Sequence, residues 1–96
     1  MPWVQIQKST EATWSDYERV QEAVGEDAPP GLIYHAAGEV DGGRWQSVSI
    51  WESEEDFSRF RDERLLPAVQ EALPPAMAEG GPPPSESFDA KHIFKP

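Results

Sequence analysis

Two histidines are the residues of this sequence best suited to proton transfer near neutral pH. His35 lies in the apolar run GLIYHAAG, and His92 lies in the C-terminal run FDAKHIF. An unperturbed imidazole titrates at about pH 6.5, so either residue could act as a general base towards a phenol or an activated methylene. Each also has a structural explanation, as a histidine that bonds a backbone carbonyl or a partner subunit. Both are candidate catalytic residues.

Polar and aromatic side chains near the first histidine are candidates for ligand contacts. Trp45 and Trp51 could stack on a flat aromatic ligand, which contributes about 0.5–1.5 kcal/mol beyond area burial, or they could pack in a dimer interface. Tyr34 could donate a hydrogen bond to a substrate carbonyl or anchor its strand. Arg44 could pair with a ligand carboxylate or stay solvated. The candidate substrate-binding residues are therefore Tyr34, Arg44, Trp45 and Trp51.

The sequence predicts neither a metal site nor a cofactor site. It contains no cysteine, which excludes disulfides and thiolate chemistry. The two histidines are far apart and match no metal-ligand spacing. Gly42 and Gly43 lie in a predicted hairpin, whereas a nucleotide loop needs a strand–turn–helix context. Ser47 and Ser49 lack the neighbouring His and Asp that would activate a nucleophile.

The composition limits the size of the fold and the kinds of partner. Ninety-six residues form one domain, residues 1–96, with a small core that self-association would enlarge. Eight basic against 18 acidic residues give a net charge of −10, which argues against binding to nucleic acid or to an anionic membrane. The start of the chain, MPWVQIQK, has no signal-peptide pattern, and no apolar run reaches membrane-spanning length. We expect a cytoplasmic protein.

Hydrophobic periodicity predicts four strands and two helices. The first helix is capped by Thr13, with Ser15 as an alternative, and it ends at Gly25. The second helix is capped by Ser53, has Phe57, Phe60 and Leu65 on its buried stripe, and is kinked or broken by Pro67. Strands are expected at residues 3–8, 32–37, 44–51 and 87–94, with a polar connector at 9–12, a hairpin loop at 39–43 and a Pro/Gly-rich loop at 74–86.

This order, βαββαβ, is the ferredoxin-like α+β plan: a four-stranded antiparallel sheet with two helices on one face. The strand at 32–37 is apolar enough to be covered on both faces. If the helices cover the face with Val4, Ile6, Val48 and Ile50, then Trp3, Trp45 and Trp51 form an exposed aromatic patch. Packing two such sheets together would cover the patch, so we expect a homodimer.

The junction WESEEDFSRF, residues 51–60, resembles the corresponding segment of the dimeric α/β-barrel superfamily, in particular the antibiotic-biosynthesis-monooxygenase-like domains. The longer run from Gly31 to Ala68 is most similar to small actinobacterial members of that superfamily, few of which have an assigned activity. The resemblance covers residues 31–73 well and the two ends only in length and strand order. It implies a homodimer in which two sheets form a barrel with a small-molecule pocket.

Members of the superfamily include cofactor-independent monooxygenases, polyketide cyclases, haem-degrading enzymes and isomerases. Many of them carry a histidine on the helix after the Trp-Glu junction, where this sequence has Phe60. The resemblance therefore does not extend to haem degradation. Two functions remain open: a cofactor-free monooxygenase-like or cyclase-like enzyme acting on a small aromatic or polyketide-like molecule, and a non-catalytic ligand-binding or structural module.

Overall fold

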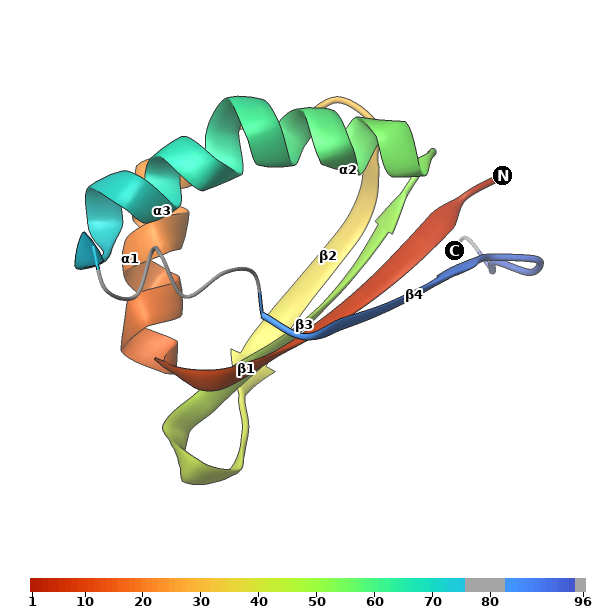
Figure 1. Cartoon of the computed structure of the whole chain (residues 1–96). Helices are drawn as coiled ribbons and strands as arrows, with labels where there is room; N and C mark the ends of the chain where they lie inside the picture. Colours follow the sequence, from red (N-terminus) through yellow and green to blue (C-terminus); the bar gives the residue numbers. More distant parts are fainter. Residues whose placement is uncertain (76–82, 95–96) are drawn as a thin grey trace.

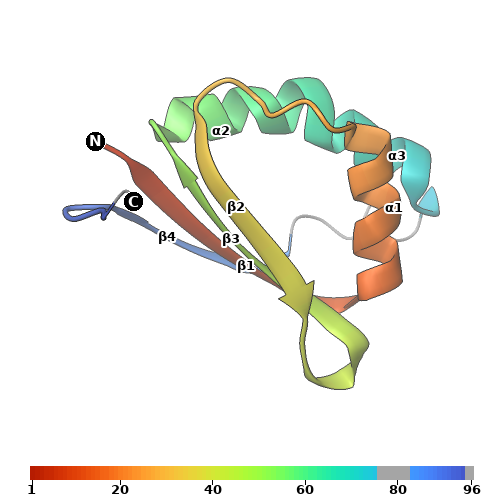
Figure 2. The same cartoon turned by 180° about the vertical axis from the view of Figure 1, so that it is seen from behind.

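The computed structural model describes residues 1–75 and 83–94, and it confirms the ferredoxin-like α+β fold. The sheet is antiparallel with strand order β2-β3-β1-β4, and both helical arms lie on one side of it (Figures 1 and 2). The elements are β1 (Trp3–Thr13), α1 (Trp14–Val24), β2 (Leu32–Glu39), η1 (Asp41–Gly43), β3 (Arg44–Trp51), α2 (Glu54–Phe60), η2 (Arg61–Leu65), α3 (Leu66–Ala72) and β4 (Ser85–Asp89).

The first strand is longer than predicted, because the expected polar connector at 9–12 belongs to it. The pairing of β1 with β3 shifts register between Lys8 and Thr13. Ser9 stabilises this irregularity: its hydroxyl donates to the Ala12 carbonyl at 2.7 Å and accepts from the Trp45 amide at 3.0 Å. A buried serine thus replaces part of the backbone ladder, which alternation of apolar residues could not reveal.

Helix α1 begins with a capping box. The Thr13 hydroxyl accepts from the Asp16 amide, and the Asp16 carboxylate accepts from the Thr13 amide at 2.9 Å. The hydrogen bond from the Thr13 amide to the Asp16 carboxylate is the main cause that lowers the pKa of Asp16. Thr13 is therefore the cap, as predicted, and Ser15 is not. The helix ends at Gly25, whose φ of 93° is positive but whose ψ of −179° is not left-handed helical.

The second helical arm is continuous from α2 through η2 to α3. Pro67 does not break it; the five residues before α3 widen into a single π-helical turn, η2. Since Pro67 lacks an amide hydrogen and its ring crowds the preceding turn, a wider turn accommodates it. Phe57 is buried and Phe60 is half-buried, as expected for the inner stripe, and Ala68 is the buried residue of α3.

The two faces of the sheet are the reverse of the predicted arrangement. Trp3 and Trp51 are paired across β1 and β3, and both rings contact Phe57 of α2, with centroids 5.4 and 5.6 Å apart. The helices therefore cover the tryptophan face, since large aromatic rings gain most from burial. The outer face, which no helix of residues 1–75 or 83–94 covers, carries Val4, Ile6, Tyr34, Ala36, Val48, Ile50 and Phe88.

Two further predictions about strands are wrong. β2 is not covered on both faces, because it is an edge strand on which Tyr34 is 61% exposed. The last strand spans Ser85–Asp89 rather than 87–94, so it begins inside the predicted 74–86 loop and ends before His92. The middle of that loop lies outside the described residues. The alternating pattern continues past the end of β4. Among the described residues, the last backbone hydrogen bond to the N-terminal segment is the one that the Ala90 amide donates to the Pro2 carbonyl at 2.8 Å.

Candidate functional site

The central contact of the candidate site joins α1 to the edge strand β2. The Tyr17 hydroxyl oxygen lies 2.6 Å from Nε2 of His35. Tyr17 faces the sheet because it is one turn before the buried Val20 on the inner stripe of α1. His35 is directly opposite Ser49 of β3, whose side chain is buried, so its imidazole points to the helix side of the sheet.

Aromatic rings surround this tyrosine–histidine pair. The Tyr17 ring stacks on Trp14, one helical turn earlier, at a centroid distance of 4.9 Å and an angle of 13°. On its sheet side it packs against Trp45 at 5.2 Å. The stacking holds the tyrosine in place and leaves its hydroxyl directed at the imidazole.

The surroundings shift the pKa values of both members of the pair. Burial raises the pKa of Tyr17 to about 12, so its hydroxyl is protonated at neutral pH. Burial also lowers the pKa of His35, which favours a neutral imidazole, although the edge position of β2 leaves part of this side chain exposed to solvent. At neutral pH the pair is therefore an uncharged phenol hydrogen-bonded to an uncharged imidazole.

A pocket of about 220 Å³ opens between the end of α1, the following loop, the sheet and α2. Its walls are formed by Gln21 and Val24 of α1, the loop residues 25–29, Leu32 and His35 of β2, Trp51 of β3 and Phe60 of α2. The wall is thus largely apolar and aromatic, with one imidazole on it. Such a lining suits a small planar molecule with a polar group to place against His35.

Arg64, from the π-helical turn, holds the loop side of this pocket. Its guanidinium donates to the Val24 carbonyl at 3.0 Å and to the Asp27 carbonyl at 2.8 Å. The same group lies over the Phe60 ring, 5.5 Å from the centroid. One side chain therefore caps the end of α1 and ties the loop after it to α2.

The inner face of the sheet continues from His35 as a row of polar side chains. Ser49 lies between His35 and Gln5 in strand register, and its hydroxyl accepts a 3.0 Å hydrogen bond from the Trp51 indole. Gln5 is 6% exposed, and its Oε1 has no hydrogen-bond partner among the described residues. A buried acceptor without a donor is costly, so this position calls for a water or a ligand group that donates.

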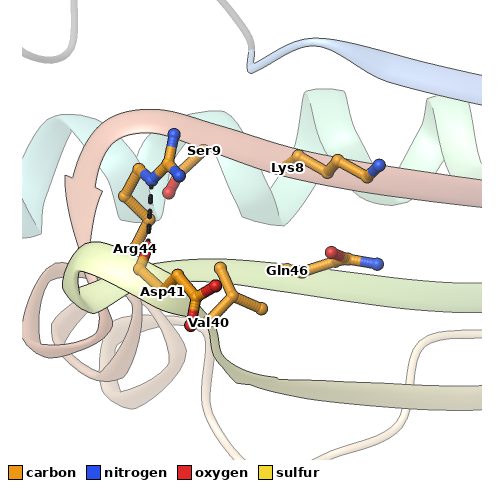
Figure 3. A pocket seen from close by; sticks show the side chains of 6 residues that line it. All are labelled: Lys8, Ser9, Val40, Asp41, Arg44 and Gln46. Carbon is orange, nitrogen blue, oxygen red and sulfur yellow. Dashed lines mark hydrogen bonds between the residues drawn. The ribbon is translucent and has the colours of Figure 1, made fainter.

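A second hollow, of about 230 Å³, lies at the hairpin end of the sheet and includes Arg44 (Figure 3). Arg44 donates through Nε to the Asp41 carbonyl at 3.3 Å. Lys8 and Gln46 extend along the sheet in one direction while Arg44 points in another (Figure 3). The two cations do not converge, so this hollow is a poor site for one anionic group.

The predicted site residues are divided among four places. His35 and Trp51 line the pocket beside α2, and Trp45 packs against Tyr17 next to it. Tyr34 lies on the outer face and Arg44 at the hairpin. His92 is exposed beyond β4, where its ring packs edge-on against Phe94 at 4.7 Å.

Sequence reasoning missed three contributors, namely Tyr17, Gln5 and Arg64. Tyr17 had a usable signal: a tyrosine on the apolar stripe of a helix needs a partner for its hydroxyl, and a histidine was available. Gln5 alternates with apolar residues and reads as a solvent-facing position. The role of Arg64 depends on the π-helical turn and on a loop 37 residues away in sequence, which no local pattern encodes.

The described residues contain no group of three or more His, Cys, Asp or Glu side chains arranged to hold a metal ion. Within the same residues, no helix is long and apolar enough to cross a membrane.

Comparisons with known proteins give matches in structure only. No protein-family model matches the chain, and no curated protein matches it in sequence. The cofactor-independent oxygenase SnoaB from Streptomyces nogalater matches with a TM-score of 0.56 and 15% identity over 97% of this chain and 95% of that one. A monooxygenase from the gene ActVA-Orf6 of Streptomyces coelicolor, in complex with the ligand nanaomycin D, matches with a TM-score of 0.58 and 17% identity. That match covers 99% of this chain and 91% of the other.

A third structure, a dimeric ferredoxin-like protein of unknown function from Thermobifida fusca, matches with a TM-score of 0.53 and 18% identity over 94% of this chain and 92% of that one. Each match extends over nearly the whole of both chains, so the similarity is one of complete domains. The comparisons show that this chain has the ferredoxin-like fold of the antibiotic-biosynthesis-monooxygenase-like proteins.

Proposed function

We propose that the protein binds a small aromatic molecule in the pocket beside His35 and starts its oxidation or cyclisation by proton transfer, without a cofactor. The observation that carries this proposal is the 2.6 Å contact between Tyr17 and His35, the histidine on the wall of that pocket. The structural neighbours described as a cofactor-independent oxygenase and a monooxygenase support the same class of chemistry.

The pair can move a proton in either direction because both groups are adaptable. A tyrosine hydroxyl donates or accepts, and a neutral imidazole carries its hydrogen on either nitrogen. When Tyr17 donates to Nε2 of His35, the hydrogen is on Nδ1, which can donate to a ligand carbonyl. When Nε2 carries the hydrogen and donates to Tyr17, Nδ1 is free to accept a proton from a phenol or an activated methylene. The lowered pKa of His35 keeps the imidazole in the neutral form that both roles need.

The proposal includes self-association through the outer face of the sheet. That face presents an apolar strip across all four strands, and Tyr34 and Phe88 on its two edge strands are 61% and 54% exposed. A second copy of the chain has the same strip and covers it by two-fold packing of the sheets. The structural neighbour described as dimeric supports this arrangement.

A second function, ligand binding without catalysis, is favoured by two observations. The pocket of about 220 Å³ is smaller than the range of about 300–1,000 Å³ typical of small-molecule sites. Phe60 lines the pocket at the position where the resemblance leads one to expect a histidine. In this reading, the tyrosine–histidine pair orients a ligand carbonyl and transfers no proton.

Anthrone distinguishes the two functions, because it is a planar tricyclic ketone with an activated methylene. Reaction with O₂ gives anthraquinone and one water, and it begins with loss of a methylene proton. We expect the protein to accelerate anthraquinone formation and oxygen uptake. His35→Gln should lower the rate at least about 100-fold, the usual contribution of a general base.

The matched control is His92→Gln, which removes the exposed histidine and should leave the rate unchanged. Anthrone that binds the wild-type protein but is oxidised no faster than in buffer would support the non-catalytic function. Equal loss of rate in both histidine variants would refute the assignment of His35 as the base.

A further inference from the structure

Among the described residues that line the pocket, only two on the loop after α1 carry a charge at neutral pH, since the imidazole of His35 is uncharged. Glu26 and Asp27 both line the pocket, and both residues are exposed to solvent. The remaining lining residues are apolar, aromatic or uncharged, and they include His35, whose pKa is lowered by burial. Among the described lining residues there is no lysine or arginine to offset the two carboxylates.

The backbone that carries these carboxylates is held by contacts at both ends and in the middle of the loop. The Gly25 amide donates to the Gln21 carbonyl at 3.0 Å, and the Leu32 amide donates to the Pro29 carbonyl at 3.2 Å. Between them, Arg64 bonds the Asp27 carbonyl at 2.8 Å. The acidic segment is thus a fixed rim rather than a free tail.

Arg64, the cation that bonds the loop, does not line the pocket. The Arg64 guanidinium is hydrogen-bonded to two main-chain carbonyls and lies over the Phe60 ring, and it is not among the lining groups. The net charge of −10 adds a background field of the same sign as the rim.

We propose that this pocket takes uncharged or cationic aromatic molecules and rejects carboxylates, because Glu26 and Asp27 form an acidic rim at its opening. The inference rests on the proposed function only in taking this pocket as the ligand site, and it holds for an enzyme and for a binding module alike. A carboxylate close to two like charges is repelled, and an ammonium at the same place is attracted. Salt weakens both effects, since the rim is exposed.

Three probes with one ring system test this selectivity: 2-naphthylmethanol, 2-naphthylmethylamine and 2-naphthoate, which are neutral, cationic and anionic near neutral pH. Binding is followed by the NMR signals of the His35 ring and the Trp51 indole, which report on the pocket itself. We expect the neutral and cationic probes to bind about tenfold or more tightly than the anionic one at low salt. The difference should shrink as salt is added.

A double substitution, Glu26→Gln with Asp27→Asn, removes the rim charge and should bring the three affinities within about threefold of one another. Its matched control, Glu11→Gln with Glu18→Gln, makes the same change in net charge at exposed positions outside the pocket and should preserve the discrimination. Equal binding of all three probes to the wild-type protein, or preserved discrimination in the rim variant, would overturn the selectivity inference alone. Absence of binding by all three would overturn the ligand site and the proposed function with it.

Discussion

The Tyr17 hydroxyl and the His35 imidazole meet at 2.6 Å across the junction of helix α1 and edge strand β2. The contact joins residues 18 positions apart, and it is the point where the helix layer and the sheet share a titratable pair. Burial acts on the two groups in opposite directions, raising the pKa of Tyr17 and lowering that of His35. Both shifts favour the uncharged forms. Acid acts on the pair by protonating His35, and alkali acts on it by deprotonating Tyr17.

On the acid side, the free energy of unfolding should fall because of His35. Its pKa in the folded protein lies below the ordinary value of 6.5, so the unfolded chain binds more protons between the two values. The contribution of the neutral imidazole to the free energy of unfolding is complete above pH 6.5, and it is lost as the pH falls through the folded-state pKa. Because solvent reaches this side chain at the sheet edge, we expect the free energy of unfolding to fall by less than about 1 kcal/mol. Urea unfolding at a series of pH values from 7.5 to 5 measures this change.

The variant His35→Gln should flatten this pH dependence, whereas His92→Gln should retain it. A wild-type stability that rises as the pH falls through this range, while the His35→Gln stability stays level, would show that the imidazole is charged in the folded state. That result would remove the neutral base on which the proposed proton transfer depends.

On the alkaline side, Tyr17 should resist ionisation. Its folded-state pKa of about 12 lies above the ordinary value of 10.0, so the stabilisation is complete below pH 10 and is lost as the pH rises towards 12. The chain has two tyrosines, so Tyr34→Phe leaves Tyr17 as the only one. We expect ultraviolet absorbance of that variant to show a single tyrosinate transition near pH 12. Tyr17→Phe should remove this transition, and a midpoint close to 10 in Tyr34→Phe would contradict the buried, hydrogen-bonded hydroxyl.

The fold was predictable because each of its main elements has a local signal. Thr13 and Ser53 are helix caps in the structure as in the sequence pattern, and the hairpin at Gly42 and Gly43 has the positive φ angles that two glycines allow. The choice of buried sheet face was not predictable in this way. Trp3 and Trp51 alternate with branched aliphatic residues, so both faces of the central strands are apolar, and only the placement of Phe57 decides between them.

The site was predictable in part for a related reason. His35 stands out by residue type, but its partner Tyr17 comes from a helix whose rotation about its own axis is set by tertiary packing. Three other candidates have residue types as suitable as that of His35, but the fold places them elsewhere. Tyr34 lies on the outer face of the sheet, Arg44 at the hairpin and His92 near the end of the chain. A site whose side chains come from different helices and strands cannot be predicted from residue types and sequence spacing alone.

The outer face of the sheet should determine the oligomeric state. Introducing a charge on the apolar strip by Phe88→Glu or Tyr34→Glu would bury a carboxylate in the proposed interface, which is strongly unfavourable. We expect the wild-type protein to sediment as a dimer and both variants to sediment as monomers. Leu66→Glu is the matched control, because Leu66 is an exposed apolar residue on α3, 47% exposed and away from the sheet face. A wild-type monomer, or equal dissociation of the control, would refute this interface.

The most position-specific prediction concerns Gly31, which links the pocket loop to β2. Its φ is +87°, and a Cβ added there would overlap the side chain of Asp56. That side chain accepts a hydrogen bond from the Ser53 hydroxyl, and the Asp56 amide donates to the same hydroxyl, so moving it disturbs the cap of α2. We expect Gly31→Ala to lower the free energy of unfolding by about 2 kcal/mol or more.

The control for this substitution is Gly38→Ala in β2, where φ is not positive and no atom lies within 4 Å of an added Cβ. There, alanine should be neutral or stabilise by up to about 1 kcal/mol, because it restricts the unfolded chain. Adding Asp56→Ala to Gly31→Ala separates the two sources of strain. Removing the carboxyl relieves the overlap but not the positive φ, so the double variant should recover part of the loss. Urea unfolding at one fixed protein concentration measures all four proteins, and equal stability of Gly31→Ala and Gly38→Ala would contradict the close packing of the loop on α2.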